Sequence, residues 1–284
     1  MKNLLIIGYG KWGAKVLKVL TRTKYFNQIY IKTRKDIFKY CNVKKILFKI
    51  KLKELPKKFN NIHICVPTIY HYKVYKNFSK NRNISIEKPL FNYLHEYNKF
   101  EEKNIKAKVN YIDLYNPILK KFFNILDLKK TKKIKFVYSS RDNFYSNQFF
   151  FLNEWLDHPL SIILQISDSL QNIKVESNKI ERKNKKFNFF KLSMNLNKIE
   201  IEVKINTKNK KTREILLYDY KKNKVIFDLI KNKISKNNKT IFSSKINSLE
   251  NFFIYGKNIK NKNKIQSMSF HKKIFLMKNL ILKT

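Results

Sequence analysis

The sequence predicts an α/β chain in which a parallel-sheet domain is followed by an α+β domain with an open, mostly antiparallel sheet. Up to Val109, short apolar runs alternate with helical patterns, and beyond Ile173 strand patterns follow one another with short turns between them. Alternating strands and helices build parallel sheets through crossover connections, whereas consecutive strands with short turns pair antiparallel. We therefore expect one domain at residues 1–115 and a second at residues 116–284.

The elements of the first domain follow from its hydrophobic pattern. Leu4 begins a run of four apolar residues, and Trp12, Val16 and Leu20 then recur at helical spacing. By the same criteria we expect strands at 4–7, 28–33, 45–50, 62–66, 84–86 and 107–109, and helices at 11–20, 36–40, 53–59, 70–79 and 92–103.

The second domain begins after Pro117 with a different rhythm. We expect helices at 117–126, 153–170 and 274–282, and strands at 134–140, 173–180, 187–196, 199–206, 213–220 and 225–229. The segment Lys221-Lys222-Asn223 between the last two strands is typical of a hairpin turn.

The chain is strongly basic, with 63 Lys and Arg against 20 Asp and Glu and a net charge of +43. Such a charge favours polyanionic partners. However, the excess is almost entirely lysine, glycine occurs four times, and alanine occurs only at Ala14 and Ala107. A genome rich in A/T codons explains this composition, and the charges are spread along the chain. We therefore expect no specific nucleic-acid partner, and keep a nucleic-acid binder only as a less favoured alternative.

The remaining composition indicates a cytoplasmic protein. The two cysteines, Cys41 and Cys65, show neither metal-ligand spacing nor a disulfide framework, so we expect no metal and a reducing compartment. The apolar run before Gly8 is too short for a signal peptide, and no uncharged stretch is long enough to span a membrane.

A glycine-rich motif, GYGKWG, joins the first predicted strand to the first helix. Its glycines permit a tight turn, close approach of the backbone to a pyrophosphate, and close helix–strand packing, and the helix start then binds the anion. Three of the four glycines in the chain fall in this motif, which reduces the chance of a coincidental match. The alternative is a tight turn in another α/β protein. The expected cofactor contacts are Gly8, Tyr9, Gly10, Lys11, Trp12 and Gly13.

The end of the second strand indicates the cofactor. Thr33, Arg34 and Lys35 lie where an acidic residue would bind the ribose hydroxyl of NAD and a basic one would accommodate the phosphate of NADP. We expect NADP, with NAD as the second choice. The alternative is that Arg34 is an ordinary exposed charge.

Two further motifs follow later strands of the parallel sheet, where ligands bind. Pro67, Thr68 and His71 belong to VPTIYH, in which Thr68 is expected to cap the following helix. Glu87 and Lys88 belong to the tripeptide Glu-Lys-Pro. Taken alone, His71 is more typical of a packing or capping histidine, and lysine is abundant in this chain.

In this order and spacing, GYGKWG, VPTIYH and EKP resemble the motifs of the glucose-fructose oxidoreductase and inositol dehydrogenase family, the Gfo/Idh/MocA oxidoreductases. That family has a Pro-Asn-x-x-His-like second motif, so Thr68 departs from it. Its second domain is an α+β unit with an open, mostly antiparallel sheet, as expected here after Pro117. The resemblance covers essentially the whole chain and is specific up to about Ser161.

The resemblance also implies a catalytic histidine on the first long helix of the second domain, four residues after an aspartate. His158 takes this position, with Glu154 where aspartate is usual. The spacing i, i+4 places both on one helix face, while Asp157 points elsewhere in a regular helix. Pro159 disturbs that regularity, which leaves open whether Glu154 or Asp157 orients His158. The alternative is an ordinary exposed pair.

The implied activity is hydride transfer between nicotinamide and a hydroxyl- or keto-bearing carbon of a sugar, inositol or sugar nucleotide. Lys88 would be a proton relay and His158 the general acid/base. Tyr111 and Tyr115 are candidates for lining the substrate pocket. The segment HPLSI is similar to the HDLSI segment of members that act on sugar nucleotides, and relatives often form dimers or tetramers.

Two other interpretations stay open. One is a family member without catalysis that acts as a cofactor-binding sensor or regulator, which the presence of Lys88 and His158 disfavours. The other is a different enzyme class with the same cofactor-binding fold, such as a methyltransferase, which the Glu-Lys-Pro motif disfavours.

Overall fold

The computed structural model describes residues 3–23, 25–33, 59, 61–78, 83–101, 108–140, 147–167, 169–183, 186–207, 210–255 and 262–283. The predicted strand at 45–50, the helix at 36–40, all but the last residue of the helix at 53–59, and the cofactor residues Arg34 and Lys35 lie outside this set. Contacts divide the chain into two units, the first comprising Met1–Tyr111, Phe252–Gly256 and Lys262–Lys272, and the second Ile112–Asn251, Lys257–Asn261 and Lys273–Thr284. The first unit therefore includes segments that are distant in sequence.

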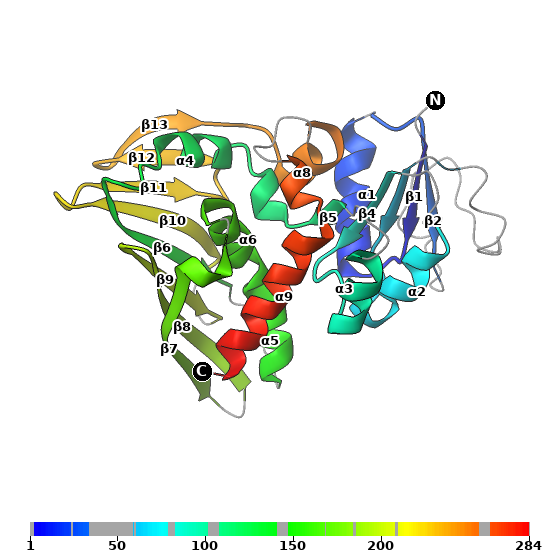
Figure 1. Cartoon of the computed structure of the whole chain (residues 1–284). Coiled ribbons are helices and arrows are strands. Elements are labelled where there is room, and N and C mark those ends of the chain that lie inside the picture. Colours follow the sequence, from blue (N-terminus) through cyan, green and yellow to red (C-terminus); the bar gives the residue numbers. More distant parts are fainter. Residues whose placement is uncertain are drawn as a thin grey trace. The chain divides into compact units, whose positions relative to one another are not determined.

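The first unit contains a five-stranded sheet, sheet A, in the order β2-β1-β3-β4-β5 (Figure 1). All its neighbouring strands pair in parallel. The strands are β1 (Asn3–Ile7), β2 (Gln28–Lys32), β3 (Asn61–Ile64), β4 (Asn83–Glu87) and β5 (Lys108–Asn110). The helices are α1 (Lys11–Thr23), α2 (His71–Lys76), α3 (Leu94–Glu101) and α8 (Lys262–Ile265). A parallel sheet with crossover helices confirms the fold class predicted for this part of the chain.

Helix α1 packs through one face. Its buried residues are Gly13, Val16, Leu17 and Leu20, which recur every three or four positions as an amphipathic helix requires. Apart from Asn3, the preceding strand β1 is apolar, and Leu4 to Ile7 are almost fully buried. The glycine-rich turn therefore connects two well-packed elements, strand β1 and helix α1.

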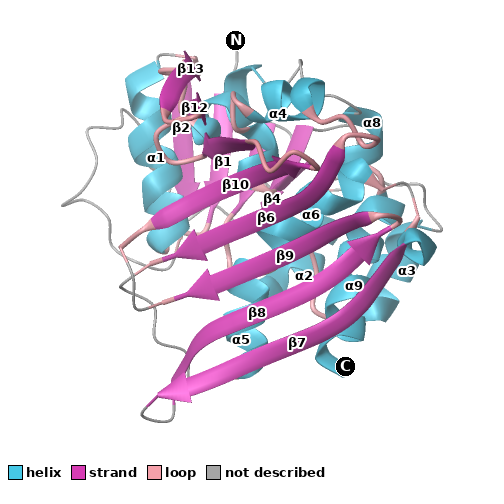
Figure 2. Ribbon diagram, turned by 90° about the vertical axis from the view of Figure 1, so that its left-hand side faces the viewer, coloured by secondary structure: helices cyan, strands magenta, loops and turns pink. Residues whose placement is uncertain are grey.

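The second unit contains an eight-stranded sheet, sheet B, in the order β13-β12-β11-β10-β6-β9-β8-β7, seen face-on in Figure 2. Strands β6 and β9 are parallel, and the other neighbours are antiparallel. The strands are β6 (Thr131–Ser139), β7 (Ile173–Lys183), β8 (Lys186–Leu196), β9 (Ile199–Asn206), β10 (Thr212–Asp219), β11 (Lys224–Asp228), β12 (Lys233–Lys236) and β13 (Lys239–Ser243). The expected open, mostly antiparallel sheet is confirmed.

The helical segments of the second unit come before and after the long strands. They are η3 (Ile112–Tyr115), α4 (Leu119–Ile125), α5 (Gln148–Trp155), α6 (Asp157–Ile166), η4 (Leu170–Asn172) and α7 (Ser248–Glu250). Segment η5 (Asn251–Tyr255) and helix α9 (Met268–Lys283) each contribute residues to both units. None of the described helices is long and apolar enough to cross a membrane.

Sheet B has one apolar face and one charged face. Ile134, Phe136 and Tyr138 alternate along β6 and are fully buried, and helices α5 and α6 lie behind the sheet in Figure 2. Lys133 and Lys135 occupy the intervening positions, and both form ion pairs with Glu202 of β9. This alternation places the core of the unit on one side of the sheet.

The expected single helix at 153–170 is wrong, because two helices, α5 and α6, occupy this region and the second ends at Ile166. Pro159 has no N–H to donate to the carbonyl of Trp155, so the helical ladder is interrupted next to Leu156. Helix α6 begins at Asp157, and Pro159 therefore lies in a first turn, where proline is tolerated. Strands β12 and β13 were not predicted.

Several turns place non-glycine residues in the left-handed backbone region. Asn197, Lys222, Asn232, Asn237 and Asn238 have φ between 48° and 63°. Asn237 and Asn238 form the two-residue connection of the β12–β13 hairpin, in which both central residues need positive φ for a type I′ turn. Asparagine tolerates this region better than most residues. It thus performs the turns that glycine would make in a chain richer in glycine.

Candidate functional site

The glycine-rich turn between β1 and α1 is fixed by close backbone approach. Gly8 has φ +99°, donates to Lys32 O at 2.8 Å, and would place a Cβ 2.7 Å from Cys65 O. A Cβ on Gly13 would lie 2.4 Å from Gly8 O. Real Cβ atoms do not approach main-chain oxygens this closely, so both positions require glycine for folding alone.

Gly10 differs from these two glycines. It is exposed, its φ is not positive, and a Cβ there would meet no atom within 4 Å. The fold itself therefore has room for a side chain at this position. The open space lies at the start of α1, a thirteen-residue helix whose first N–H groups favour an anion.

The other predicted cofactor residues around this turn are at least partly accessible. Lys11 is exposed, and Tyr9, Trp12 and Thr33 are half-buried. Thr33 directly follows β2, and Lys15 Nζ lies 4.5 Å from the centre of the Trp12 ring. The indole therefore has an adjacent cation.

His71 connects the second and third motifs. Its Nε2 lies 2.8 Å from Val66 O, and its Nδ1 lies 3.0 Å from Leu90 O and 3.1 Å from Pro89 O. The residue is 1% exposed, and burial lowers the pKa of His71 although the three carbonyls act to raise it. This geometry gives His71 a bracing role between the two loops.

Thr68 does not cap a helix as predicted. It is the first residue of a short 3-10 turn, η2 (Thr68–Tyr70), with exposed Pro67 in the capping position, and Tyr70 precedes helix α2. The extra 3-10 turn moves the start of the α-helix to His71. Thr68 is half-buried, which leaves its side chain partly accessible.

Glu87 faces the interior of the first unit. Its Oε1 accepts a hydrogen bond from Asn110 Nδ2 at 2.8 Å and lies 3.1 Å from His63 Nε2. Lys88 is half-buried beside it, and the Lys88–Pro89 peptide bond is cis. Within the Glu-Lys-Pro motif, Glu87 is therefore enclosed and Lys88 is partly accessible.

His158 lies near the start of α6 and is 2% exposed. Its Nδ1 lies 3.4 Å from Oδ2 of Asp113, which is 3% exposed. Asp113 in turn accepts hydrogen bonds from Tyr138 Oη at 3.0 Å and from Arg213 at 2.9 Å. A buried carboxylate with two fixed donors is well suited to orient an imidazole.

Tyr138 also contacts the histidine directly. Its ring lies nearly parallel to that of His158, with centroids 6.0 Å apart. Burial, together with the charge of Asp113, raises the pKa of Tyr138 well above its usual value. Its hydroxyl therefore remains a hydrogen-bond donor to Asp113 at physiological pH.

The two carboxylates considered from sequence have other surroundings. Asp157 Oδ1 lies 2.7 Å from Lys278 Nζ, and the same ammonium donates to Asn153 Oδ1 at 2.7 Å. Glu154 is half-buried on α5, on the other side of the break from His158. The structure thus supplies Asp113 as a carboxylate for His158 that the sequence prediction missed. Its position in the sequence, three residues after the last residue of β5, was the available signal.

Tyr111 and Tyr115 are both 1% exposed. Tyr111 packs against Phe270 and His271, at centroid distances of 6.2 and 5.7 Å. Burial raises the pKa of Tyr115. Both tyrosines are therefore core residues of their units.

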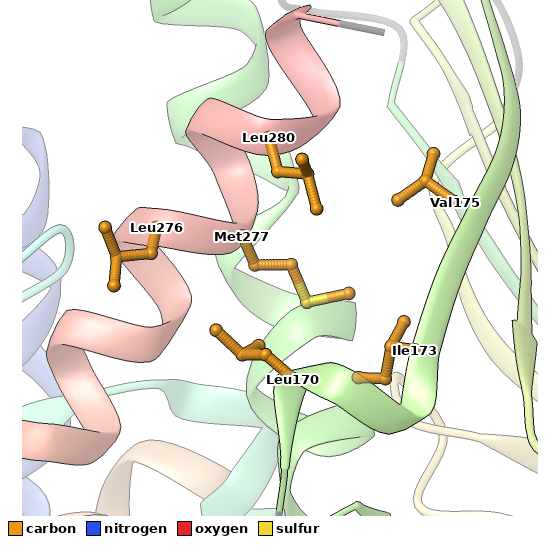
Figure 3. A pocket seen from close by; sticks show the side chains of 6 residues that line it. All are labelled: Leu170, Ile173, Val175, Leu276, Met277 and Leu280. Carbon is orange, nitrogen blue, oxygen red and sulfur yellow. The ribbon is translucent and has the colours of Figure 1, made fainter.

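Two cavities lie in the second unit. One, of about 180 Å³, is apolar and is lined by Leu170, Ile173, Val175, Leu276, Met277 and Leu280 (Figure 3). The other, of about 550 Å³, is more polar and includes Lys129, Asn172, Lys198 and Tyr220 in its wall. No candidate catalytic residue is among the lining residues of either cavity.

The fold is shared with solved oxidoreductase structures of low sequence identity. The chain is similar to a dehydrogenase (MviM) from Clostridium difficile, with a TM-score of 0.78, 14% identity and 99% of each chain covered. It is similar to a Gfo/Idh/MocA family oxidoreductase from Vibrio cholerae, with a TM-score of 0.73, 13% identity, and coverage of 100% of this chain and 99% of that one. It is also similar to UDP-N-acetylglucosamine 3-dehydrogenase GnnA from Acidithiobacillus ferrooxidans, with a TM-score of 0.73, 11% identity, and coverage of 98% and 96%.

By sequence, no protein-family model and no curated protein matches the chain. The fold expected from the three motifs is therefore confirmed by structure, at identities at which sequence alone gives no match.

Proposed function

We propose that this chain is a nicotinamide-dependent oxidoreductase that transfers a hydride between its cofactor and a hydroxyl- or keto-bearing carbon of a sugar, inositol or sugar nucleotide. The observation that carries this proposal is the open space over Gly10 between two glycines that the fold requires. A phosphate can approach the backbone there and meet the first N–H groups of α1. Solved structures with this fold include enzymes named as dehydrogenases.

The residues present fit a dinucleotide. Gly8 and Gly13 shape the turn, Gly10 leaves room for the pyrophosphate, and exposed Lys11 adds positive charge beside it. Thr33 at the end of β2, followed in sequence by Arg34 and Lys35, provides the hydroxyl and cations that suit the extra phosphate of NADP. We therefore favour NADP over NAD.

The chemistry divides between the cofactor and the side chains. When bound, the nicotinamide supplies or accepts the hydride. Lys88 donates a hydrogen bond to the reacting oxygen, and His158 accepts or returns the proton as general acid/base. Asp113 holds the imidazole in one orientation and stabilises its protonated form, as Arg213 and Tyr138 hold Asp113.

A sugar nucleotide is the substrate class that we favour. GnnA, which has this fold, is named for a UDP-sugar, and the segment His158–Ile162 is similar to one found in enzymes acting on sugar nucleotides. The net charge of +43 also attracts a substrate that carries a diphosphate.

The test is a titration with NADPH and NADH at low and at high salt. The chain has two tryptophans, so Trp155→Phe leaves Trp12, inside the proposed phosphate loop, as the fluorescent reporter. We expect saturable quenching that persists at high salt and is tighter for NADPH. High salt is necessary because a strongly basic protein attracts phosphate compounds non-specifically, and this attraction is screened.

Two variants make the titration specific. Gly10→Ala should fold normally, because its Cβ meets no protein atom within 4 Å. It should bind the cofactor more weakly, because the Cβ takes up part of the space proposed for the pyrophosphate. Gly10→Glu should abolish binding, because it places a carboxylate in that space. If the quenching is lost at high salt, or is the same in Gly10→Glu as in the wild type, the glycine-rich motif is only a structural turn and does not bind the cofactor. Cofactor binding without turnover of any sugar nucleotide would favour a sensor.

A further inference from the structure

A cluster of polar side chains lies on one face of sheet A, at the carboxyl ends of its central strands. His63 is opposite Ser85 in the β3–β4 register, and Glu87 is opposite Asn110 in the β4–β5 register. Cys65 follows two residues after His63 and so points to the same side. His63 is fully buried and Asn110 is 2% exposed. The sequence analysis expected no metal, because the two cysteines lack metal-ligand spacing.

Both ring nitrogens of His63 have polar partners. Nδ1 lies 2.8 Å from Ser85 Oγ, which in turn lies 3.2 Å from Ile62 O. The hydroxyl has one hydrogen and donates it to either of these two partners. When it donates to Ile62 O, Nδ1–H donates to Ser85 and Nε2 carries the lone pair.

In that tautomer the lone pair of Nε2 faces Glu87 Oε1 at 3.1 Å, and both atoms are available to a cation. In the other tautomer Nε2–H donates to the same oxygen, and the pair is an ordinary hydrogen bond. The cluster therefore accommodates either a proton or a metal ion between these two atoms.

The thiol favours the metal. The ligand atoms of His63, Cys65 and Glu87 all lie within 4.8 Å of one another. A proton needs only the nitrogen and the oxygen, whereas a metal ion uses all three atoms. For metal–ligand bonds of roughly 2.0–2.3 Å in tetrahedral geometry, ligand atoms lie about 3.3–3.8 Å apart. Small side-chain movements are enough to bring the ligand atoms of His63, Cys65 and Glu87 from their present spacing to these distances.

We propose that His63, Cys65 and Glu87 form a binding site for one borderline-soft divalent cation, for which Zn²⁺ has the matching ligand preferences. Ser85 Oγ contacts the other ring nitrogen of His63, as the outer partners of metal-bound histidines do. Asn110 Nδ2 donates to Glu87 Oε1 at 2.8 Å and so holds the carboxylate in place. Half-buried Cys65 provides access from solvent.

A bound ion would join the ends of β3 and β4. These strands lead directly into the VPTIYH and Glu-Lys-Pro loops. The site thus has a structural role that is separate from hydride transfer, and it belongs entirely to the first unit.

The experiment uses Co²⁺ as a spectroscopic probe on untagged, chelator-treated full-length protein without cofactor. We expect one Co²⁺ per chain, a near-ultraviolet band from thiolate-to-cobalt charge transfer, and loss of that band on stoichiometric addition of Zn²⁺. The band should be absent in Cys65→Ser and present in Cys41→Ser, the matched variant at the other cysteine of the chain. Ser85→Ala should keep the band and weaken Co²⁺ binding by about 10–100-fold.

The proposal is overturned if wild-type protein shows no thiolate band, since a shared proton between His63 and Glu87 would then account for the cluster. It is also overturned if the band survives in Cys65→Ser. The wild-type spectrum decides the question even if a variant fails to fold. Because no nucleotide is present, the outcome is independent of the cofactor titration.

Discussion

Asp113 and His158 form a buried carboxylate–imidazole pair, with Asp113 Oδ2 lying 3.4 Å from His158 Nδ1. The aspartate comes from the turn after the last strand of sheet A, and the histidine from α6. Arg213 and Tyr138 bind the carboxylate from two further strands, β10 and β6. Four separate segments of the chain therefore determine the orientation of one imidazole.

This pair predicts which substitutions lower turnover. His158→Gln should reduce kcat by about 10²–10⁴-fold, the usual contribution of a general acid/base. Asp113→Asn should lower kcat by less than that but by more than Glu154→Gln, because Asp113 is the carboxylate within ion-pair distance of the ring. The affinity for NADPH should stay unchanged. Steady-state kinetics with a sugar nucleotide provides the measurement.

Asp127→Asn is the control for these variants, because Asp127 is exposed in the same unit. Equal losses in Asp113→Asn and Asp127→Asn would contradict the orienting role of Asp113, as would a greater loss in Glu154→Gln.

The buried ion pair between Asp157 and Lys278 predicts a large effect on stability. Their side chains are 1% and 6% exposed. Lys278→Met should lower the free energy of unfolding by about 3–5 kcal/mol, because it leaves a buried carboxylate without its cation. Urea unfolding in a Trp12→Phe background, followed by Trp155 fluorescence, measures this change in the second unit.

Two comparisons test the cause of this loss. The double variant Asp157→Leu/Lys278→Met should recover most of the stability, since no uncompensated charge remains. Lys130→Met, which removes an exposed pair with Asp127 at 3.5 Å, should leave the free energy of unfolding nearly unchanged. A double variant as unstable as Lys278→Met would show that packing rather than charge decides the outcome.

Two of the three glycines in the phosphate turn predict opposite stability effects. Gly13→Ala should destabilise the first unit by about 1–3 kcal/mol, because its Cβ must displace the main chain at Gly8 O. Gly10→Ala should be neutral or slightly stabilising, since the space is open and the unfolded chain loses freedom. Thermal unfolding followed by Trp12 fluorescence distinguishes them, and similar losses in both variants would refute the assignment.

Glu202 predicts an acid-dependent contribution to stability. Burial acts to raise its pKa, but the ammonium groups of Lys135 and Lys133 lower the pKa of Glu202 to about 2 from an ordinary value of 4.5. The folded state therefore favours the carboxylate, and this contribution is complete above about pH 4.5 and is lost as the pH falls towards 2.

Urea midpoints measured between these pH values test this dependence. Glu202→Gln should flatten the decline in stability with falling pH, whereas Glu176→Gln, at an exposed position, should preserve it. An unchanged slope in Glu202→Gln would contradict the pairing with the two lysines.

The first unit was predictable because its signals are local. An apolar strand, a glycine turn and an amphipathic helix follow one another in a few residues, and β1 and α1 begin within one residue of their expected positions. Sheet B was largely predictable for the same reason, since β8 and β9 alternate regularly. Strands β12 and β13 were not predicted because they are short and together carry three lysines. Their strand conformation depends on pairing within the hairpin and not on their composition.

The candidate site was less predictable because its partners are distant in sequence. Asp113 acquires its role from Arg213 and Tyr138, which no local pattern connects. Helical spacing pointed instead to Glu154, but this spacing assumes one continuous helix, which the break beside Leu156 removes. The roles of Lys88 and His158 in catalysis remain predictions.

The turns formed by asparagine affect how well sequence comparison detects proteins of the same fold. A left-handed turn is specified by backbone geometry, and Asn197, Asn232, Asn237 and Asn238 satisfy that geometry in a chain with four glycines. A comparison by residue identity that expects glycine there counts each asparagine as a mismatch, although the path of the chain is unchanged. Codon bias thus lowers residue identity while the fold is kept, and this chain combines 11–14% identity with TM-scores of 0.73–0.78.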